Sequence, residues 1–442
     1  MLLGHRWTNT TTLGHIQRSV RVCLDLLWIN ENTQWRKPMS TAPFPCAVKA
    51  SFWRGGTSKG VFFNIDDLPE WMQSILNSEK HPDKSQFQKM EGFFAAVMGS
   101  PDSYGRQLNG MGGGISSLSK AMVVGPSSLS DVDVDYTFFQ IGVKDGKLDM
   151  AGNCGNLSSA VGPFALNSGI YRGAPDTEQA NNDIETGSVT MKMRNTNTKK
   201  IIESTFEACK INGFWQYLEL GKSSIDGVPG TASTITLSFL DPEGSKTPNA
   251  LPTGNAMDHI KIGDQAIRAS LIDVSDPGIF IDGRDVGWHT GATPEDLNAD
   301  EQLLGRLEAI RKEGTKMMGL DPNVSSIPKI VLLFPAKADG LDISCQALSM
   351  EQAHKAVPVT LALNLGAACK MEGTIPNQLS KHLNHANTVI GHPSGTLVVG
   401  ADIQNGKIRS AKLLRTARCH MDGMVNITKA DEDELNFEDP EC

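Results

Sequence analysis

Apolar and polar residues alternate in many short segments of the chain, and this pattern predicts a protein built largely from β-strands. Residues 48–53 alternate in this way, and the Gly-rich turn Arg54–Gly60 joins them to a second apolar run. Residues 188–240 alternate repeatedly, as expected for an antiparallel sheet with one solvated face. Further on, residues 269–281 have a strand, turn and strand pattern, and Ile330–Phe334 has the composition of a short buried strand.

Three longer segments carry the spacing of a helix with one apolar face. They are residues 68–98, residues 301–318, and a segment rich in Ala and Leu that opens at Ser349–His354 and continues to about Cys369. Many strands with a few long helices predict a protein of the α+β class.

The length of 442 residues exceeds what a single hydrophobic core usually serves, so we expect two domains. Residues 241–255 contain three prolines and two glycines and are the best candidate for a connection between them. We expect an N-terminal extension over 1–44, a first domain over 45–245, a second over 246–430 and an acidic tail over 431–442. A return of the last strand to the first domain is left open.

The formal charge of −9 argues against nucleic acid or an anionic membrane as the main partner. No apolar run reaches the length of a transmembrane helix. A small anionic substrate is compatible with this charge only in a pocket whose local charge is positive.

Eight cysteines are scattered along the chain without a CxxC pair, which indicates reduced thiols rather than a disulfide framework or a zinc site. His382, His385 and His392 lie close in sequence, but no acidic third ligand has a suitable spacing. We therefore expect no metal.

The N-terminal stretch differs in composition from the rest of the chain. It has no acidic residue before Asp25 and resembles a mitochondrial transit peptide, although a divergent extension would look the same. An N-glycosylation sequon at Asn156 falls inside the suspected site described below, which argues against a secretory route. We expect a cytoplasmic protein, with a mitochondrial location as the alternative.

The segment Gly152–Asn156 places the thiol of Cys154 between glycines and asparagines, just before a run of small residues compatible with a helix. Glycine allows a sharp turn close to a ligand, and free N–H groups at a helix start favour an anion. This pattern is typical of an active site. The alternative is a small buried cysteine at a turn.

Two further Gly-rich segments carry polar side chains. The turn after the first strand presents Arg54, Ser58 and Lys59 and lacks the spacing of a phosphate loop, so carboxylate binding and an ordinary surface hairpin are the two interpretations. The segment 110–120 leads through hydroxyl side chains to Lys120 at the start of a strand, where a solvated lysine is the alternative.

The segment Gly391–Gly400 has a similar pattern, with glycines around Ser394 and an apolar continuation. We expect it to form a second anion-binding turn at a helix start, facing the first turn across a shared cleft.

Taken together, these segments resemble the family of 2-methylaconitate cis–trans isomerases, called PrpF. The resemblance covers roughly residues 45–428, and several motifs in the same order are more specific than any one Gly-rich turn. The matching motifs are Arg54–Gly60, Gly99–Asp102, Gly110–Gly113 with Ser116, Ser117, Ser119 and Lys120, Gly152–Asn156, Ser349–Met350 with His354, Gly391–Gly395, and Arg415–Arg418.

The resemblance implies a diaminopimelate-epimerase-like fold. This fold has two similar domains, each a curved, mostly antiparallel sheet around a central helix, with the active site in the cleft between them. The resemblance also implies that no cofactor is used and that Lys120 and Cys154 are the acid and base. Ser394 stands where the epimerases of this fold place a second cysteine, which argues against racemisation by a pair of thiols.

Within the family, the sequence most resembles the fungal aconitate Δ-isomerases, which convert cis-aconitate into trans-aconitate on the route to itaconate. The alternatives are an isomerase of 2-methylaconitate or a related unsaturated acid, and a non-catalytic carboxylate-binding protein. The turns at 276–280 and 351–356 differ from the commoner bacterial pattern and leave the substrate open.

The expected partner is a small tricarboxylate, and a homo-oligomer is possible. The motif positions and the adjoining polar residues give a set of expected substrate-binding residues. They are Arg54, Ser58, Lys59, Ser117, Asn153, Gly155, Asn156, His354, His392, Ser394, Gly395 and Arg418.

Overall fold

The computed structural model describes residues 47–78, 81–150, 153–178, 185–289, 292–324, 327–336, 338–349, 352–381 and 386–427. The predicted N-terminal extension, the acidic tail, Gly152, Met350, His382 and His385 lie outside these residues.

The first half of the fold is a mixed sheet that begins with the predicted hairpin around Arg54–Gly60. Strand β3 pairs with β2 in parallel, and β7 pairs with β4 in parallel, while the other neighbours are antiparallel. The principal strands are β1 (Ala47–Gly55), β2 (Ser58–Asn64), β3 (Lys120–Pro126), β4 (Val134–Ile141), β7 (Thr186–Asn195), β8 (Ile201–Ile211) and β12 (Ile235–Leu240), and the shorter ones are β5 (Leu148–Asp149), β6 (Asp176–Glu178), β9 (Phe214–Tyr217), β10 (Ser223–Ile225) and β11 (Val228–Ala232).

Helices cover both faces of this sheet. On one face, Trp53 and Phe62 of the sheet pack against Phe164 of the central helix. On the other face, Phe63 packs against Phe94. The central helix is α4 (Val161–Asn167), preceded by the 3₁₀ turn η3 (Leu157–Ala160), and the remaining helical segments are η1 (Ile65–Asp67), α2 (Glu70–Leu76), α3 (Lys84–Met98) and η2 (Ser116–Leu118).

The second half repeats this order of pairings. Strands β15 and β16 are parallel, as are β17 and β19, with antiparallel neighbours on either side. The elements are β13 (Asp258–Ile262), β14 (Gln265–Val274), β15 (Asp276–Asp282), η4 (Gly283–Val286), α5 (Pro294–Ala299), α6 (Glu301–Met317), β16 (Lys329–Pro335), β17 (Ile343–Ser349), β18 (Gln352–Ala353), α7 (Val359–Ala368), α8 (Ile375–Leu379), β19 (Asn387–His392), β20 (Gly395–Gln404), β21 (Lys407–Arg415) and β22 (Ala417–Asn426). In the first half, α4 lies between the parallel partners β4 and β7 in the chain. In the second half, α7 is the first helix between the parallel partners β17 and β19.

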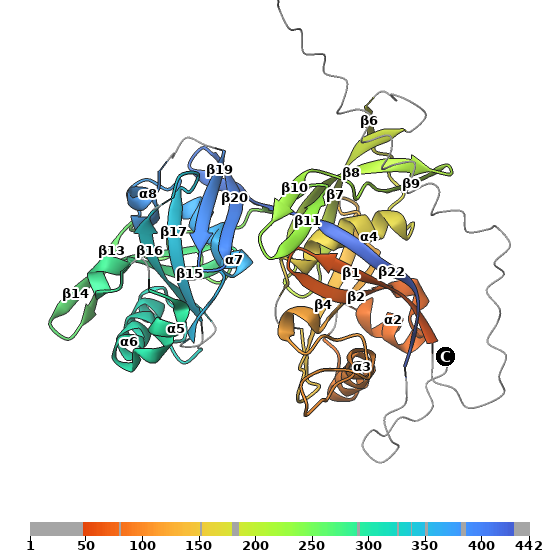
Figure 1. The fold of residues 1–442 in the computed structure, drawn as a ribbon, viewed down its shortest axis with the longest axis horizontal. Coiled ribbons are helices and arrows are strands. Elements are labelled where there is room, and N and C mark those ends of the chain that lie inside the picture. The colour runs from red at the N-terminus through yellow and green to blue at the C-terminus, as the bar shows by residue number, and fades with distance from the viewer. Residues whose placement is uncertain are drawn as a thin grey trace, which may run out of the picture. The chain divides into compact units, whose positions relative to one another are not determined.

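The last strands connect the two halves. Strand β21 pairs with β12 of the first half, and β22 pairs with β1 along nine residues that run from Ala47 to Gly55 (Figure 1). The chain therefore returns to its first sheet after completing the second, and hydrogen bonds between strands continue from one half into the other.

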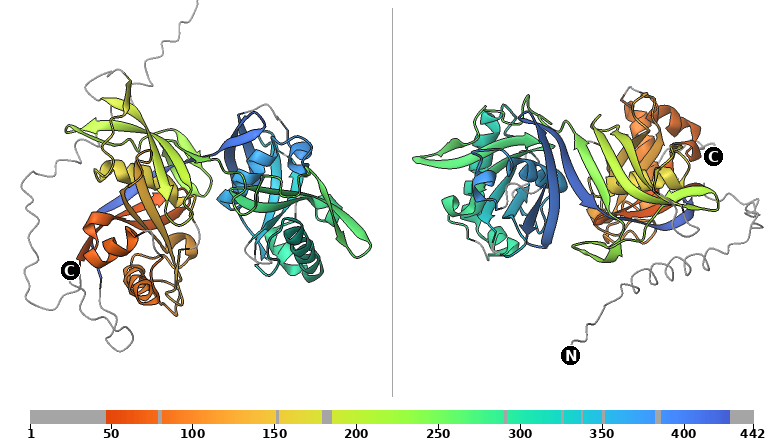
Figure 2. Two further views of the ribbon diagram at one scale, coloured as in Figure 1. Left: turned by 180° about the vertical axis from the view of Figure 1, so that it is seen from behind. Right: turned by 90° about the horizontal axis from the view of Figure 1, so that it is seen from above.

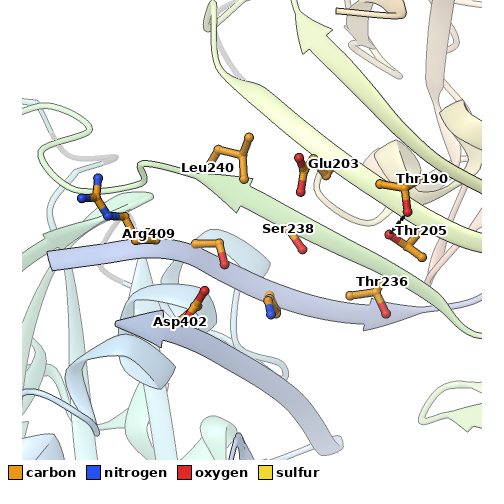
Figure 3. Close-up of a pocket in the computed structure, with 10 residues that line it drawn as sticks. Thr190, Glu203, Thr205, Thr236, Ser238, Leu240, Asp402 and Arg409 are labelled. Atoms are coloured by element: carbon orange, nitrogen blue, oxygen red, sulfur yellow. Dashed lines mark hydrogen bonds between the residues drawn. The ribbon is translucent and has the colours of Figure 1, made fainter. Parts of the chain in front are cut away.

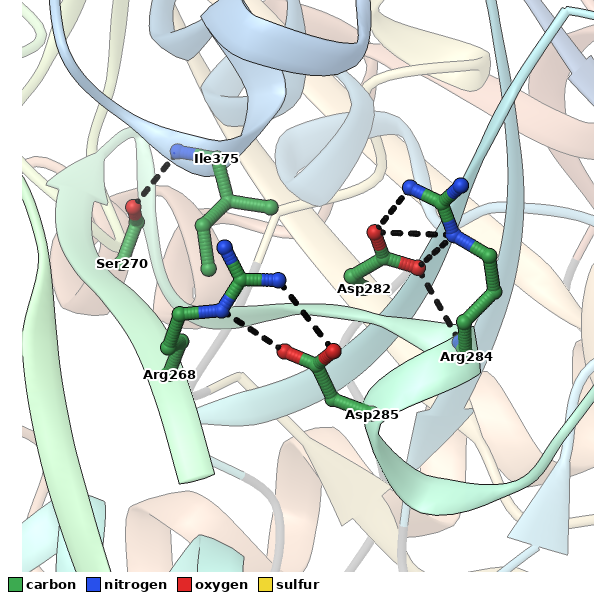
Figure 4. A network of polar contacts seen from close by, with 6 residues as sticks. All are labelled: Arg268, Ser270, Asp282, Arg284, Asp285 and Ile375. Carbon is green, nitrogen blue, oxygen red and sulfur yellow. Dashed lines mark hydrogen bonds and ion pairs between the residues drawn. The ribbon is translucent and has the colours of Figure 1, made fainter. Parts of the chain in front are cut away.

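The second half has its own core and its own polar anchors. Helix α6 packs on β13 and β16, where Leu307 and Ile310 are buried (Figures 1 and 2). Ser270 Oγ accepts the backbone N–H of Ile375 at 2.9 Å and fixes the start of α8 (Figure 4). Nearby, Arg268 Nε and Asp285 form an ion pair of 3.1 Å beside Asp282, which caps η4.

Two helix predictions need correction. Residues 68–98 form two helices rather than one, because Asp83 starts α3 with a capping box that its side chain makes with Gln86. The predicted helix from Ser349 begins only at Val359, with Pro358 at its N-cap, and Gln352–Ala353 is a strand. Residues before a proline favour extended backbone, which explains the later start.

Candidate active site around Cys154

Cys154 lies half-buried in the turn that leads into η3. The Leu157 N–H donates to its Sγ at 3.5 Å, and the thiol lies 3.7 Å from Ser58 Oγ at the start of β2. The carbonyl of Cys154 accepts bonds from the backbone N–H and the hydroxyl of Ser158, at 2.9 and 3.0 Å. The thiol is thus held at a tight turn with hydrogen-bonding groups directed at its sulfur.

Asn153 anchors this turn to the sheet. Its Oδ1 accepts the Ser158 hydroxyl at 2.9 Å and the Tyr136 hydroxyl at 3.3 Å, and Asn195 Nδ2 lies 3.4 Å away. Burial raises the pKa of Tyr136 to about 12, so its hydroxyl remains a donor at neutral pH. These bonds explain the position of Asn153 without a ligand.

Gly155 and Asn156 make close contacts that constrain the turn. A Cβ placed on Gly155 would lie 2.7 Å from Cγ1 of Val359, the first residue of α7, so the turn meets the central helix of the second half. Asn156 Oδ1 accepts a bond from Arg415 Nε at 2.8 Å. Gly56 has φ +52°, and a Cβ there would come within 2.4 Å of Asn156 Oδ1, so glycine is required for this packing.

Arg415 is a buried cation of the Arg415–Arg418 motif, from which only Arg418 was predicted to bind substrate. Only 7% of the residue is exposed, and burial lowers the pKa of its guanidinium to about 10, while the nearby charge of Cys154 acts in the opposite direction. A signal was available: Arg415 follows Leu413 in the alternation of β21, at a position that points inward.

Lys120 is the first residue of β3 and is mostly buried. It donates to the side chain of Gln140, its cross-strand partner, and its Nζ lies 5.1 Å from the centre of the Phe138 ring. Strand alternation places Lys120 on the same face as Met122, which packs toward α4. Ser117 is half-buried in η2, three residues earlier.

Ser58 shares this face with Lys120. In β2 it alternates with residues that lead to Phe62, which packs on α4. Lys120 and the Ser58–Cys154 pair therefore lie on the same side of the sheet.

Arg54, Lys59 and Arg418 form a row across three strands. Arg54 is the register partner of both Lys59 in β2 and Arg418 in β22, so their side chains share a face. Arg54 alternates with Trp53, which packs on α4, and Lys59 alternates with Ser58. The alternation directs these three cations to the face opposite Cys154.

Both arginines of this row have partners within the protein. Arg54 Nη1 donates to the carbonyls of Thr416 and Gly56 at 2.9 and 3.0 Å, and burial lowers its pKa. Arg418 Nε pairs with Glu219 at 3.1 Å.

The predicted helix start at Ser394–Gly395 is wrong, because these residues form a hairpin turn between β19 and β20. The Ser394 N–H donates to His392 Nδ1 at 3.2 Å, and its hydroxyl donates to the Lys355 carbonyl at 2.6 Å. Two residues further on, the N–H of Thr396 donates to Asp226 at 2.5 Å. The run Thr396–Val399 is rich in β-branched residues, which favours a strand over a helix.

His392 belongs to the surroundings of Arg415. Burial lowers the pKa of His392, the charge of Asp226 opposes that change, and the charge of Arg415 adds to it. A Cβ on Gly395 would lie 2.4 Å from Asp226 Oδ2, so this glycine also permits a close approach.

His354 lies on the segment that leads into α7, the counterpart of the turn that leads from Cys154 into α4. Burial and then the charge of Lys329 lower its pKa. Lys329 begins β16 as Lys120 begins β3, and Asp276 begins β15 as Ser58 begins β2. Lys329 Nζ is paired with Asp276 at 2.7 Å, whereas the partner of Lys120 is a neutral amide.

The described residues also contain a shallow hollow of about 480 Å³ outside this site (Figure 3). Ser410 and Lys412 line it, on the face of β21 opposite Leu413. The residues labelled in Figure 3 are mainly hydroxyl and charged side chains, among them Thr190, Thr205 and Thr236. The hollow therefore lies on the face of β21 opposite the one to which the side chain of Arg415 points.

The described part of the chain has neither a cluster of metal-ligating side chains nor a helix that could span a membrane. No three or more His, Cys, Asp or Glu side chains there are grouped to hold a metal ion. No described helix has the length and apolar character needed to cross a membrane.

Comparisons with known proteins agree across nearly the whole chain. The model of the family described as PrpF protein matches residues 46–428. A Shewanella oneidensis protein named 2-methyl-aconitate isomerase is 33% identical over 418 residues, which cover 88% of this chain and 100% of that protein. The 3-methylitaconate isomerase of Eubacterium barkeri is 32% identical over 410 residues, covering 87% of this chain and 97% of that protein.

A solved structure shares the fold. The crystal structure of methylitaconate-delta-isomerase matches with a TM-score of 0.75 at 30% identity, over 90% of this chain and 99% of that chain. The likeness shows that this chain has the fold of that isomerase, and its mixed sheet with few helices confirms the predicted α+β class.

Proposed function

Because this chain belongs to the PrpF protein family, we propose that it is an isomerase that shifts a carbon–carbon double bond within a small unsaturated carboxylic acid. The relatives are named for 2-methylaconitate and methylitaconate, so acids of this type are the first substrates to consider. These names favour the alternative left open by the sequence over the conversion of cis-aconitate into trans-aconitate. cis-Aconitate lacks only the methyl group of 2-methylaconitate and remains a second candidate substrate.

The observation that carries the proposal is the placement of Cys154. Its sulfur lies in a glycine-bounded turn beside Ser58, on the sheet face that Lys120 also occupies. A thiol and an amine on one face are suited to remove a proton at one end of an allyl unit and deliver one at the other.

The reaction needs two proton movements and no change of oxidation state. One group takes a proton from the carbon next to the alkene, and the electron pair of that C–H bond becomes the new double bond. The other group protonates the former alkene carbon. Between the two proton transfers, negative charge spreads onto a carboxylate of the substrate. Positive charge and N–H donors at the site therefore stabilise the transition state more than the substrate.

The first test is an assay of the purified chain against 2-methylaconitate, methylitaconate and cis-aconitate, with products separated by chromatography. We expect one of them to be isomerised, and Cys154→Ala and Lys120→Ala to lose at least about a hundredfold in rate. Full activity of either folded variant removes that residue from the mechanism. Binding of these acids without turnover would instead support a non-catalytic carboxylate-binding protein.

A further inference from the structure

We propose that Arg415 is the residue that binds a substrate carboxylate beside Cys154, an inference that rests on the proposed function. The cations expected for this role were Arg54, Lys59 and Arg418, and strand alternation directs all three to the other face of the sheet. Arg415 is a buried arginine on the side of Cys154, where Lys120 is the proposed acid or base.

The guanidinium is held through two of its three nitrogens. Nε donates to Asn156 Oδ1 at 2.8 Å and Nη1 donates to the Leu414 carbonyl at 2.9 Å. Within the described residues, Nη2 makes no hydrogen bond. The bond to Asn156 ties the guanidinium to the turn that carries the thiol, so the two N–H groups of Nη2 and the second N–H of Nη1 are oriented in advance and remain as donors.

The charge of Arg415 has no counter-ion in the described part of the chain. No carboxylate there forms an ion pair with Arg415, although the residue is only 7% exposed. Burying an unpaired charge is costly, and this cost is relieved when an anion arrives. Arginine presents a planar fork that matches a carboxylate in a bidentate manner, which lysine cannot do.

The surrounding groups fit an anion at this place. Cys154 and His392 both interact electrostatically with Arg415. Asp226 is the carboxylate that acts on His392, and it is already bonded to the N–H and hydroxyl of Thr396, at 2.5 and 2.9 Å. Asp226 is therefore engaged in the hairpin turn and leaves the guanidinium to an external carboxylate.

The test measures protection of Cys154 from alkylation by iodoacetamide, with tricarballylate as a saturated tricarboxylate that cannot isomerise. Modification at Cys154 is followed by mass spectrometry of its peptide as tricarballylate is added. The variants are Arg415→Gln and Arg415→Lys. The control is Arg409→Gln, which removes a half-exposed arginine from the same strand β21.

We expect the half-protecting concentration of tricarballylate to rise about tenfold or more in Arg415→Gln, because bonds to charged groups are worth about 1.5–3 kcal/mol. Arg415→Lys should fall between Arg415→Gln and the wild type, and Arg409→Gln should match the wild type. For a substrate that is turned over, KM should rise more than kcat falls. If Arg415→Gln does not fold, Arg415→Lys carries the test, because it keeps the charge and loses the fork.

Equal protection of the wild type and both Arg415 variants, or no protection of the wild-type thiol, would overturn the inference. The proposed function fails separately. Arg415-dependent protection without turnover of any unsaturated acid would sustain the carboxylate site and refute the isomerase. If the wild type isomerises an unsaturated acid while KM and the protection by tricarballylate are unchanged in the Arg415 variants, the isomerase is sustained and the carboxylate site at Arg415 is refuted.

Discussion

At the scale of single residues, the surroundings of Cys154 differ from those of Cys345, Cys369 and Cys419. Burial raises the pKa of Cys345 and of Cys369 to about 12, and burial together with Asp422 does the same for Cys419. These thiols remain protonated and unreactive at neutral pH. Cys154 is half-buried, unlike the buried Cys345 and Cys369, and its sulfur receives an N–H bond and lies beside the Ser58 hydroxyl, whereas the Cys419 thiol lies beside the Asp422 carboxylate.

The glycine at position 56 offers a direct test of how tightly this turn is packed. Both Gly56→Ala and Gly263→Ala place a side chain at positive φ, +52° and +58°, and each should cost about 1–2 kcal/mol of unfolding free energy. Only at Gly56 does the new Cβ meet Asn156 and Arg415. We expect Gly56→Ala to lose more stability in urea unfolding and most of its activity.

Gly263→Ala is the control, since nothing lies within 4 Å of its added Cβ. Equal losses of stability and activity in both variants would show that the contact with Asn156 does not matter.

Histidine burial predicts how stability depends on pH. Burial lowers the pKa of His392 below its ordinary 6.5, so the unfolded chain binds a proton more readily than the folded one. The contribution of neutral His392 to the free energy of unfolding should be fully present above pH 6.5. It should be lost as the pH falls from 6.5 toward the lower pKa of His392 in the folded protein. The thermal midpoint should therefore fall less steeply between pH 7.5 and 5.5 in His392→Gln, values chosen to span roughly a unit on each side.

His259→Gln serves as the control, because His259 is exposed in β13. If the midpoint of His392→Gln follows the same pH curve as that of His259→Gln, the burial of His392 does not contribute to acid sensitivity.

The sequence predicted part of the site at this scale and missed another part. Cys154 stood out because a thiol between glycines is unusual, and Lys120 because a lysine follows a glycine run at a strand start. Arg415 was missed because its burial depends on β21 pairing with β12, which lies about 180 residues away in sequence. Which cation of the Arg415–Arg418 motif faces inward depends on strand direction.

At the scale of elements, local pattern was a good guide where strands and turns adjoin. The hairpin of β1 and β2, the strands β14 and β15, and helix α6 lie where alternation and helical spacing predicted them. The start of α7 was misjudged because the apolar periodicity was followed past Pro358. The hairpin of β19 and β20 was taken for a helix start because Gly-rich turns precede both kinds of element.

Asn364 is a polar residue within the apolar helix α7. It is fully buried, and its Nδ2 donates to the carbonyls of Ile272 and Asp276, both at 2.7 Å, across the turn between β14 and β15. We expect Asn364→Leu to lower the free energy of unfolding by about 2 kcal/mol despite the added apolar surface, because two buried carbonyls lose their donor. Urea unfolding followed by tryptophan fluorescence measures this.

Leu363→Met is the matched control at the neighbouring buried position and should cost less than about 1.5 kcal/mol. A stabilised Asn364→Leu would mean that the unpaired Oδ1 of Asn364 costs more than its two bonds contribute.

At the scale of the whole molecule, the fold is a repeat whose two halves differ in chemistry. In the first half, Val61 of β2 is the register partner of Ala121 in β3, so Gly60 and Lys120 precede them at the start of this parallel pair. In the second half, Gly278 of β15 is the register partner of Lys329 at the start of β16. The first half presents Ser58 and Lys120 at the starts of these strands, while the second presents Asp276 and Lys329. The segment before the central helix carries Cys154 in the first half and His354 in the second.

This difference suggests that only the first half supplies the acid and base. Lys329 is held by Asp276, whereas Lys120 faces a neutral amide. Alternation and turn motifs could not reveal this, since equivalence between the halves depends on which strands pair in parallel.

The most direct test of the central claim is isomerisation in D₂O followed by proton NMR, with Lys120→Gln, Cys154→Ala and Lys329→Gln compared with the wild type. We expect the wild type to move the double bond of an acid of the 2-methylaconitate or methylitaconate type and to incorporate solvent deuterium. Lys329→Gln should be less stable yet keep kcat within about threefold, while Lys120→Gln and Cys154→Ala lose both isomerisation and deuterium incorporation. Wild-type rates in Lys120→Gln or Cys154→Ala, or loss of activity in a folded Lys329→Gln alone, would contradict it.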